Sequence, residues 1–292
     1  MNLNAIHGRA AWLAEGTVRR QSGGHCIGGA LSCFRFKIKH EITYPQTTER
    51  PFAMKKNLSL LCVLGCFVQP VWAASIDSIG ILSQSEFKSF SEDMSSAVSY
   101  KPVTPAEPLG ILGFDVGLEV TDTEMQNPAL WSKATSGAFT SNSVILPKLH
   151  MFIGLPFNID VGAFYSEAPS TNIKLYGGEL RYAILEGGTA SPAVAIRGSF
   201  SQMTGVDQLS FETKGLDVSI SKGLAMFTPY AGIGEVWSDS TPNGIPTLTK
   251  ESFNQTKYFV GCNLKILLVN LALEYDKTGS APSYSAKLGM RF

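Results

Sequence analysis

The sequence predicts an all-β protein, an antiparallel transmembrane β-barrel of about ten strands preceded by a short helix. Apolar and polar residues alternate with a period of two through most of the chain after residue 108. The last nine residues (284–292, YSAKLGMRF) keep this alternation and end on an aromatic residue. The chain is 44% apolar and 16% charged, yet after the N-terminal region it has no charge-free apolar run of ~18 residues, which argues against membrane-spanning helices.

An export signal is predicted at residues 54–73 rather than at the start of the chain. Two lysines follow Met54, an apolar stretch covers 58–68, Pro70 interrupts it, and small residues lead to a cleavage point after Ala73. A buried core helix explains this order less well. Lipoprotein processing at Cys66 is a second possibility, because the preceding residues resemble a lipobox.

Residues 1–53 have no expected role in the mature protein, and we interpret them as a non-native N-terminal extension or a disordered basic leader. After Ala73 the chain carries 15 Lys/Arg and 21 Asp/Glu, so its negative charge disfavours nucleic acid as a partner. Cys262 is the one cysteine in this part, which excludes an intrachain disulfide there.

Residues 74–108 are expected to form an amphipathic helix and a linker. An apolar stripe at helical spacing predicts the helix over 85–100, capped by Ser83 or Ser85. Three prolines in 101–108 predict a stiff, non-helical linker. The helix is expected to plug the barrel or lie beside it in the periplasm; a partly ordered tail is the alternative.

Residues 109–292 form the predicted barrel. The ten predicted strands are 109–121, 144–155, 158–166, 172–185, 193–202, 208–222, 229–238, 257–267, 269–276 and 284–292. In the sixth, the apolar positions change phase near Lys214, which suggests a β-bulge. The seventh is glycine-rich, and we expect Glu235 to face inward with Tyr230 and Val236 outward. These two ambiguous strands leave eight or twelve strands possible.

The connections indicate how the barrel is oriented. The two longest loops, 122–143 and 239–256, both follow odd-numbered strands and so lie at one end. Long loops outside and short turns inside are typical of bacterial barrels, with both chain ends in the periplasm.

A secreted β-sandwich would also alternate, but its core would not accommodate charges. The outward face is nearly free of charge, and aromatic residues lie near strand ends, as in an interfacial girdle. The residues predicted to face the lumen are Asp115, Glu119, His150, Glu179, Arg181, Arg197, Lys265, Glu274 and Lys287.

With its signal peptide, alternating strands and terminal Y-x-A-x-L-x-M-x-F, the chain resembles Gram-negative outer-membrane β-barrel proteins. The resemblance covers 109–292 and implies location and fold, not a substrate. It implies outer-membrane lipid and the barrel-assembly machinery as partners, and that machinery reads the last strand. By likeness, the assembly signal here is Tyr284, Leu288, Met290 and Phe292.

A ten-stranded barrel is narrow, because open pores need ~16 strands. Inward glycines could leave space for a thin channel or for the helix, whereas charges of both signs favour pairing across the lumen. By the same resemblance, outer-membrane proteases and phospholipases need a histidine at the external rim or the lipid interface, but His150 lies alone in mid-strand without a companion motif. No cofactor motif or metal-ligand spacing is present, so we expect no enzymatic activity.

Two functions therefore remain open from the sequence. The first is narrow passage, or lumenal binding of a small solute or lipid. The second is a structural or surface-adhesion barrel that acts through the external loops 122–143 and 239–256.

Overall fold

The computed structural model describes residues 75–168, 173–188 and 190–292. The predicted extension, the signal peptide, the cleavage point after Ala73 and the possible lipidation at Cys66 lie outside these residues. Ten strands form the wall: β1 (Phe114–Glu124), β2 (Ser143–Leu155), β3 (Ile159–Glu167), β4 (Lys174–Glu186), β5 (Ala193–Thr204), β6 (Leu209–Ser221), β7 (Phe227–Pro242), β8 (Glu251–Ile266), β9 (Val269–Thr278) and β10 (Ala281–Arg291).

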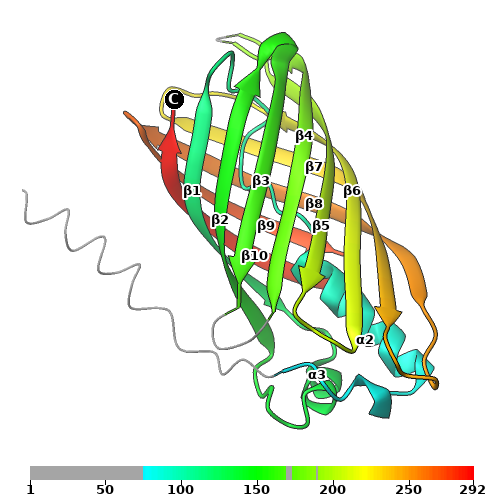
Figure 1. Ribbon diagram of the computed structural model, residues 1–292. Helices are drawn as coiled ribbons and strands as arrows, with labels where there is room; N and C mark the ends of the chain where they lie inside the picture. The colour runs from blue at the N-terminus through cyan, green and yellow to red at the C-terminus, as the bar shows by residue number, and fades with distance from the viewer. Residues whose placement is uncertain (1–74, 169–172, 189) are drawn as a thin grey trace, which may run out of the picture. The chain divides into compact units, whose positions relative to one another are not determined.

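The strands close into one antiparallel barrel, each paired with its sequence neighbours and β1 paired with β10 (Figure 1). The closing seam runs from Asp115 opposite Arg291 to Thr123 opposite Ser283. The predicted strand number and antiparallel closure are thus confirmed. The first strand is shorter than predicted, beginning at Phe114 rather than residue 109, whereas β8 begins six residues earlier, at Glu251.

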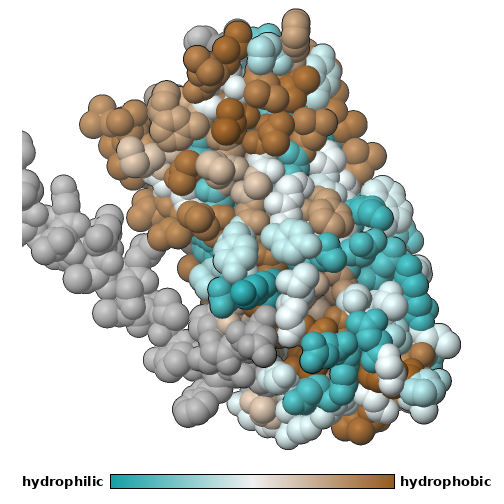
Figure 2. Space-filling model, in the orientation of Figure 1, coloured by the Kyte–Doolittle hydropathy of each residue, from teal (hydrophilic) through white to brown (hydrophobic). Residues whose placement is uncertain are grey.

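The outer surface carries a continuous apolar belt with aromatic residues at both margins. Figure 2 shows hydrophobic residues gathered toward the end that carries the short turns, and hydrophilic residues toward the other end. Tyr165, Tyr176 and Tyr258 are each 41–45% exposed on one margin, and Phe157 and Phe292 lie on the other. A charged interior inside an apolar, aromatic-edged exterior is the architecture of an outer-membrane β-barrel.

Two face assignments for the middle strands are wrong. In β7, Tyr230 and Val236 are buried inside the barrel, whereas Glu235 faces outward and accepts hydrogen bonds from Asn254 and Thr256. The glycines of this strand gave no alternation to read. Strand β6 has no bulge, because its pairings with both neighbours run without a register shift. The register shift lies instead between β4 and β5, at Ala183 and Leu185.

The change of phase in β6 has another cause. Leu209 and Phe211 face inward, where they pack against a helix inside the barrel, whereas Leu216, Val218 and Ile220 face outward within the apolar belt. The inside is apolar at one end of the strand and the outside is apolar at the other. The side chains alternate regularly throughout, and only their surroundings change.

The helix inside the barrel is α2 (Gln84–Val98), which follows the short helix η1 (Ile79–Ile81). It begins where predicted, with Ser83 and Glu86 forming a reciprocal capping box. Neither α2 nor any other helix of the described residues is long and apolar enough to span a membrane.

The N-terminal segment runs through the barrel from one end to the other. Residue 78 donates its backbone N–H to Ala134 in the connection 125–142, at what we call the long-loop end. The chain then passes inside the wall and enters β1 at the opposite, short-turn end, where Phe114 and Phe292 exchange backbone hydrogen bonds. In Figure 1, α2 and α3 lie at one end and the C-terminus at the other. Residues 75 and 292 therefore lie at opposite ends of the barrel, and the expectation that both chain ends lie on the same side is wrong for the described residues.

The two long connections are more ordered and shorter than predicted. The first contains α3 (Pro128–Ala134), and the second covers only 243–250, because β7 and β8 extend beyond their predicted ends. A short 3-10 helix, η2 (Pro156–Asn158), forms the turn between β2 and β3.

Candidate functional site: the plugged lumen and the outer wall near the long-loop end

The lumen at the long-loop end is filled by an apolar core around α2. Phe87, Phe90 and Met94 project from one stripe of the helix and are at most 3% exposed. Phe90 contacts Trp131 of α3, with ring centroids 4.8 Å apart, and Trp131 in turn contacts Phe139 at 5.4 Å. Helix α2 is therefore held between the barrel wall and the connection that folds over it.

The opposite side of α2 meets the wall through small hydroxyl side chains. Ser91 donates to Ser240 at 2.8 Å, and the Oγ atoms of Ser95 and Ser238 lie 2.7 Å apart. All four side chains are buried. One side of the helix thus packs through large apolar groups, and the other fits closely against β7 through paired hydroxyls.

Residues 99–109 continue the plug toward the short-turn end as an extended segment. Its backbone carbonyls are held by cations of the wall: Lys257 donates to the Tyr100 carbonyl at 2.5 Å, and Arg181 donates to the Pro105 carbonyl at 2.6 Å. The segment contributes one cation itself, Lys101, whose Nζ lies 3.0 Å from Asp276. We call residues 84–109 the plug.

The buried charges around this segment are balanced. Among the described residues of the wall and of 99–109, seven buried carboxylates face seven buried cations: Asp115, Glu119, Asp160, Glu179, Asp217, Glu274 and Asp276 against Lys101, Lys148, Arg181, Arg197, Lys257, Lys287 and Arg291. Such charges are tolerated in a protein interior when they are paired and hydrogen-bonded.

The tightest pairs join neighbouring strands. Arg197 binds Asp217 through two hydrogen bonds of 2.6 and 3.0 Å and also lies 3.6 Å from Glu179. Arg181 binds Asp160 at 2.7 and 3.1 Å. These fork-like guanidinium–carboxylate contacts fix both direction and distance.

The predicted histidine belongs to the same network. His150 Nε2 lies 2.9 Å from a carboxylate oxygen of Glu119, whose other oxygen accepts from Lys148 at 2.8 Å. The imidazole is fully buried and surrounded by the rings of Tyr100, Phe152 and Phe164. A group enclosed in this way has no access to a substrate arriving from either end.

Glycines of the wall make room for aromatic rings and do not leave an open channel. Each of four inward aromatic residues lies opposite a glycine of the next strand, where a Cβ atom would collide with the ring: Phe152–Gly162, Phe164–Gly177, Tyr230–Gly261 and Phe259–Gly232. Glycine at such positions permits the close approach of a neighbouring group. The inward glycines therefore contribute to filling the lumen.

Eight of the nine residues predicted to face the lumen are buried there, and Lys265 is exposed at the short-turn end. Lys265 lines a hollow of about 450 Å³ with Glu107, Asn263 and Arg291. Sequence reasoning missed Asp217 and Lys101. The regular alternation of β6 could have revealed Asp217, but nothing local to residue 101 indicates that it reaches β9.

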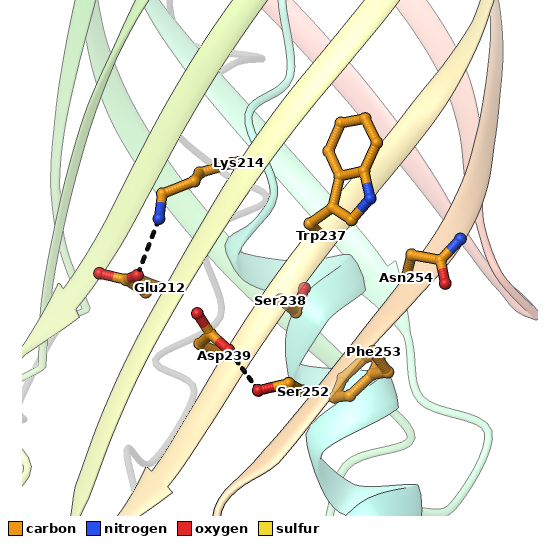
Figure 3. Close-up of a pocket in the computed structure, with 8 residues that line it drawn as sticks. All are labelled: Glu212, Lys214, Trp237, Ser238, Asp239, Ser252, Phe253 and Asn254. Atoms are coloured by element: carbon orange, nitrogen blue, oxygen red, sulfur yellow. Dashed lines mark hydrogen bonds and ion pairs between the residues drawn. The ribbon is translucent and has the colours of Figure 1, made fainter.

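The outer wall of β6, β7 and β8 carries a polar hollow beyond the apolar belt. Two rows cross these strands in register: Lys214, Trp237 and Asn254, and then Glu212, Asp239 and Ser252. Figure 3 shows the Trp237 ring between these polar groups, with Lys214 bonded to Glu212 and Ser252 bonded to Asp239. The hollow has a volume of about 350 Å³, and Trp237 is 46% exposed.

The described residues contain no group of three or more His, Cys, Asp or Glu side chains able to hold a metal ion. Trp131 and Phe139, which the sequence places in an exposed binding loop, are instead buried against α2. Trp237 on the wall is an accessible aromatic residue near this end. Trp237 was not identified from the sequence because the inward and outward faces of β7 were assigned the wrong way round.

No family model matches the chain, and no curated protein matches it by sequence. Among solved structures it is similar to the N-terminal β-barrel domain of Pseudomonas aeruginosa OprF (12% identity, 61% of this chain and 97% of that chain, TM-score 0.33). It is also similar to a loop-deletion mutant of OmpT from Vibrio cholerae (12% identity, 51% and 54%, TM-score 0.28) and to Ail of Yersinia pestis (11%, 63% and 99%, TM-score 0.23). The assignment of the fold rests on the strand pairing described above.

Proposed function

We propose that this chain is a non-enzymatic outer-membrane barrel that is closed by its own N-terminal segment and acts through the surface at its long-loop end. The observation that carries the proposal is the plug, which fills the lumen along its length with buried apolar, hydroxyl and ionic contacts. Passive diffusion of a solute would require these contacts to break. The polar groups that a partner outside the barrel can reach lie instead on the outer wall around Trp237.

Single-channel recording in planar bilayers tests the closed lumen. We expect the full-length protein to give no steady conductance, whereas a variant lacking residues 75–108 leaves a charge-lined passage and conducts. Persistent current through the full-length protein would contradict the proposal.

A gated passage is the second candidate, and the paired serines between α2 and β7 favour it. A helix face of small hydroxyls can leave the wall without exposing large apolar groups on that side. The double substitution Ser95→Cys and Ser238→Cys places two thiols where the hydroxyls lie 2.7 Å apart. If brief openings of the wild type disappear when this pair is oxidised and return on reduction, the gated passage replaces the closed barrel.

The surface role is tested on whole cells. Trp237→Ser removes the exposed ring of the polar wall, and Tyr182→Ser is the matched control on the outer face nearer the short turns, 48% exposed. We expect only the first substitution to reduce attachment of cells to a surface that the wild type binds. Equal attachment of the two variants would exclude the wall as the binding surface.

A further inference from the structure

Three connections at the short-turn end carry large apolar side chains at their tips. Leu112 lies just before β1, Phe157 lies between β2 and β3, and Leu267 lies between β8 and β9. Each of these residues is at least 80% exposed. The connections border six adjacent strands, from β8 across the closing seam to β3. We call these three residues, together with the exposed Ile111 and Leu268, the apolar rim.

The backbone at the three tips has the left-handed conformation, which normally favours glycine or asparagine. The φ angles of Leu112, Phe157 and Leu267 are 64°, 65° and 57°. A large side chain makes this conformation costly, and a side chain surrounded by water makes no contact that offsets the cost. Removing a leucine or phenylalanine side chain from water gains at least as much free energy as the conformation costs. The residue types at the tips therefore indicate that their surroundings are not water.

The apolar belt on the strands is too short to cross a membrane without the rim. On β9, the outward face is apolar from Tyr275 to Val269, and Lys277 comes next on the same face. At ~3.3 Å per residue and a tilt of ~40°, residues 269–275 rise only ~15 Å, whereas the apolar band of such barrels is ~25 Å tall. Leu267 and Leu268 directly precede Val269, so the rim supplies part of the missing height.

The turn backbone at the rim is hydrogen-bonded to neighbouring strands. Leu112 donates its N–H to the Gly154 carbonyl at 3.2 Å, and the Leu268 carbonyl accepts from the Arg291 N–H at 3.0 Å. Such pairing inside the protein is what a lipid environment requires of backbone polar groups. The polar connection 187–192, between β4 and β5, lies outside the rim.

We propose that the apolar rim is immersed in the hydrocarbon of the lipid bilayer, so that the turns on the seam side of the barrel do not project into water. Hydrocarbon is the partner that this surface fits, because the rim and the belt are continuous (Figure 2). The rim completes the height of the belt. Burial of its side chains in lipid offsets the cost of the left-handed backbone at Leu112, Phe157 and Leu267.

Urea unfolding of the full-length protein in vesicles of dilauroylphosphatidylcholine tests the rim, because this sample contains lipid and no partner protein. Asparagine adopts the left-handed conformation more readily than leucine does, but its amide is costly to place in hydrocarbon. We expect Leu267→Asn to lower the urea midpoint by about 0.5 M. Phe157→Asn repeats the measurement at a second tip, with the same expected direction. An unchanged or raised midpoint would mean that the tips lie in water and would overturn the proposal.

Two further substitutions separate burial in lipid from backbone strain. Leu267→Met keeps an apolar side chain and should leave the midpoint unchanged. If Leu267→Met lowers the midpoint as much as Leu267→Asn does, the proposal fails. Heat-modifiable gel migration confirms that each variant is folded.

Gly244→Leu is the matched control at the long-loop end. Gly244 has a φ angle of 71°, and a Cβ atom there would meet open space. A leucine at this position is strained and in water, so we expect a lower urea midpoint. An unchanged midpoint would show that a left-handed leucine is not costly in a turn, and the proposal would lose its basis.

Discussion

The two halves of the lumen are built by opposite chemistry within one wall. At the long-loop end, the inward positions of β6 are Leu209 and Phe211, and they join an apolar core around α2. Farther along, the inward positions carry charges such as Arg197 and Asp217, which enclose an extended backbone. A helix offers side chains to pack against, whereas an extended segment offers carbonyl groups that need donors. The inward residues of the wall are therefore apolar beside the side chains of α2 and charged beside the backbone carbonyl groups of the extended segment.

The largest expected effect is in the ionic half. Arg197→Ala leaves Asp217 and Glu179 buried without their cation, and we expect it to destabilise the folded barrel by ~3–5 kcal/mol. Urea unfolding in detergent, followed by tryptophan fluorescence, measures the change. Replacing the pair together, Arg197→Met with Asp217→Leu, is the control and should recover only part of the loss, because Glu179 still lacks its cation. If Arg197→Ala destabilises the barrel no more than the double substitution does, Arg197 and Asp217 do not stabilise each other as an ion pair.

In the apolar half, we expect Phe90→Ala to lower the free energy of unfolding by ~3–5 kcal/mol. The loss should be at the lower end of this range if the connection 125–142 moves to fill the cavity that the ring leaves. The fully buried ring contacts Trp131, so its loss should also loosen α3. Hydrogen exchange of residues 84–98 and 128–134 reports this directly. If exchange rises throughout the wall instead, the apolar core and the wall unfold as one unit.

The sequence alone predicts the strands of the barrel wall but not the contacts that the plug makes inside it. Period-two alternation predicts the strand number, the closing seam and the inward position of residues such as Glu119 and Lys287. It misleads where the surroundings change along a strand, as in β6, and where glycine removes the pattern, as in β7. The partners of the plug could not be predicted, because residue 101 and Asp276 meet only through the closed three-dimensional fold.

A smaller effect is expected at the start of α2, within the apolar half. Ser83→Ala removes the side chain that accepts the Glu86 N–H, and loss of such a cap costs ~1 kcal/mol. Ser83→Asn should retain most of the stability, because asparagine is an equally good capping residue. Both are measured as shifts of the urea midpoint, and similar loss in the two variants would exclude capping as the cause.

The smallest effect depends on pH at the same helix start. The backbone N–H of Ser83, followed by Lys133, lowers the pKa of Glu86 from 4.5 to about 2. Since the folded-state pKa is depressed, the stabilisation is present above pH 4.5 and is lost as the pH falls toward 2. The difference in urea midpoint between wild type and Glu86→Gln should shrink over that interval. A constant difference would mean that the carboxylate contributes through packing alone.

The route of the plug also determines the order in which the molecule can be built. Helix α2, with side chains, is about 10–12 Å across and is held at one end of the barrel, whereas the segment after it leaves at the other. A wall already sealed would have to admit this helix through a space filled by aromatic rings and ion pairs. We therefore expect the plug to be in place before the last pair of neighbouring strands closes the barrel.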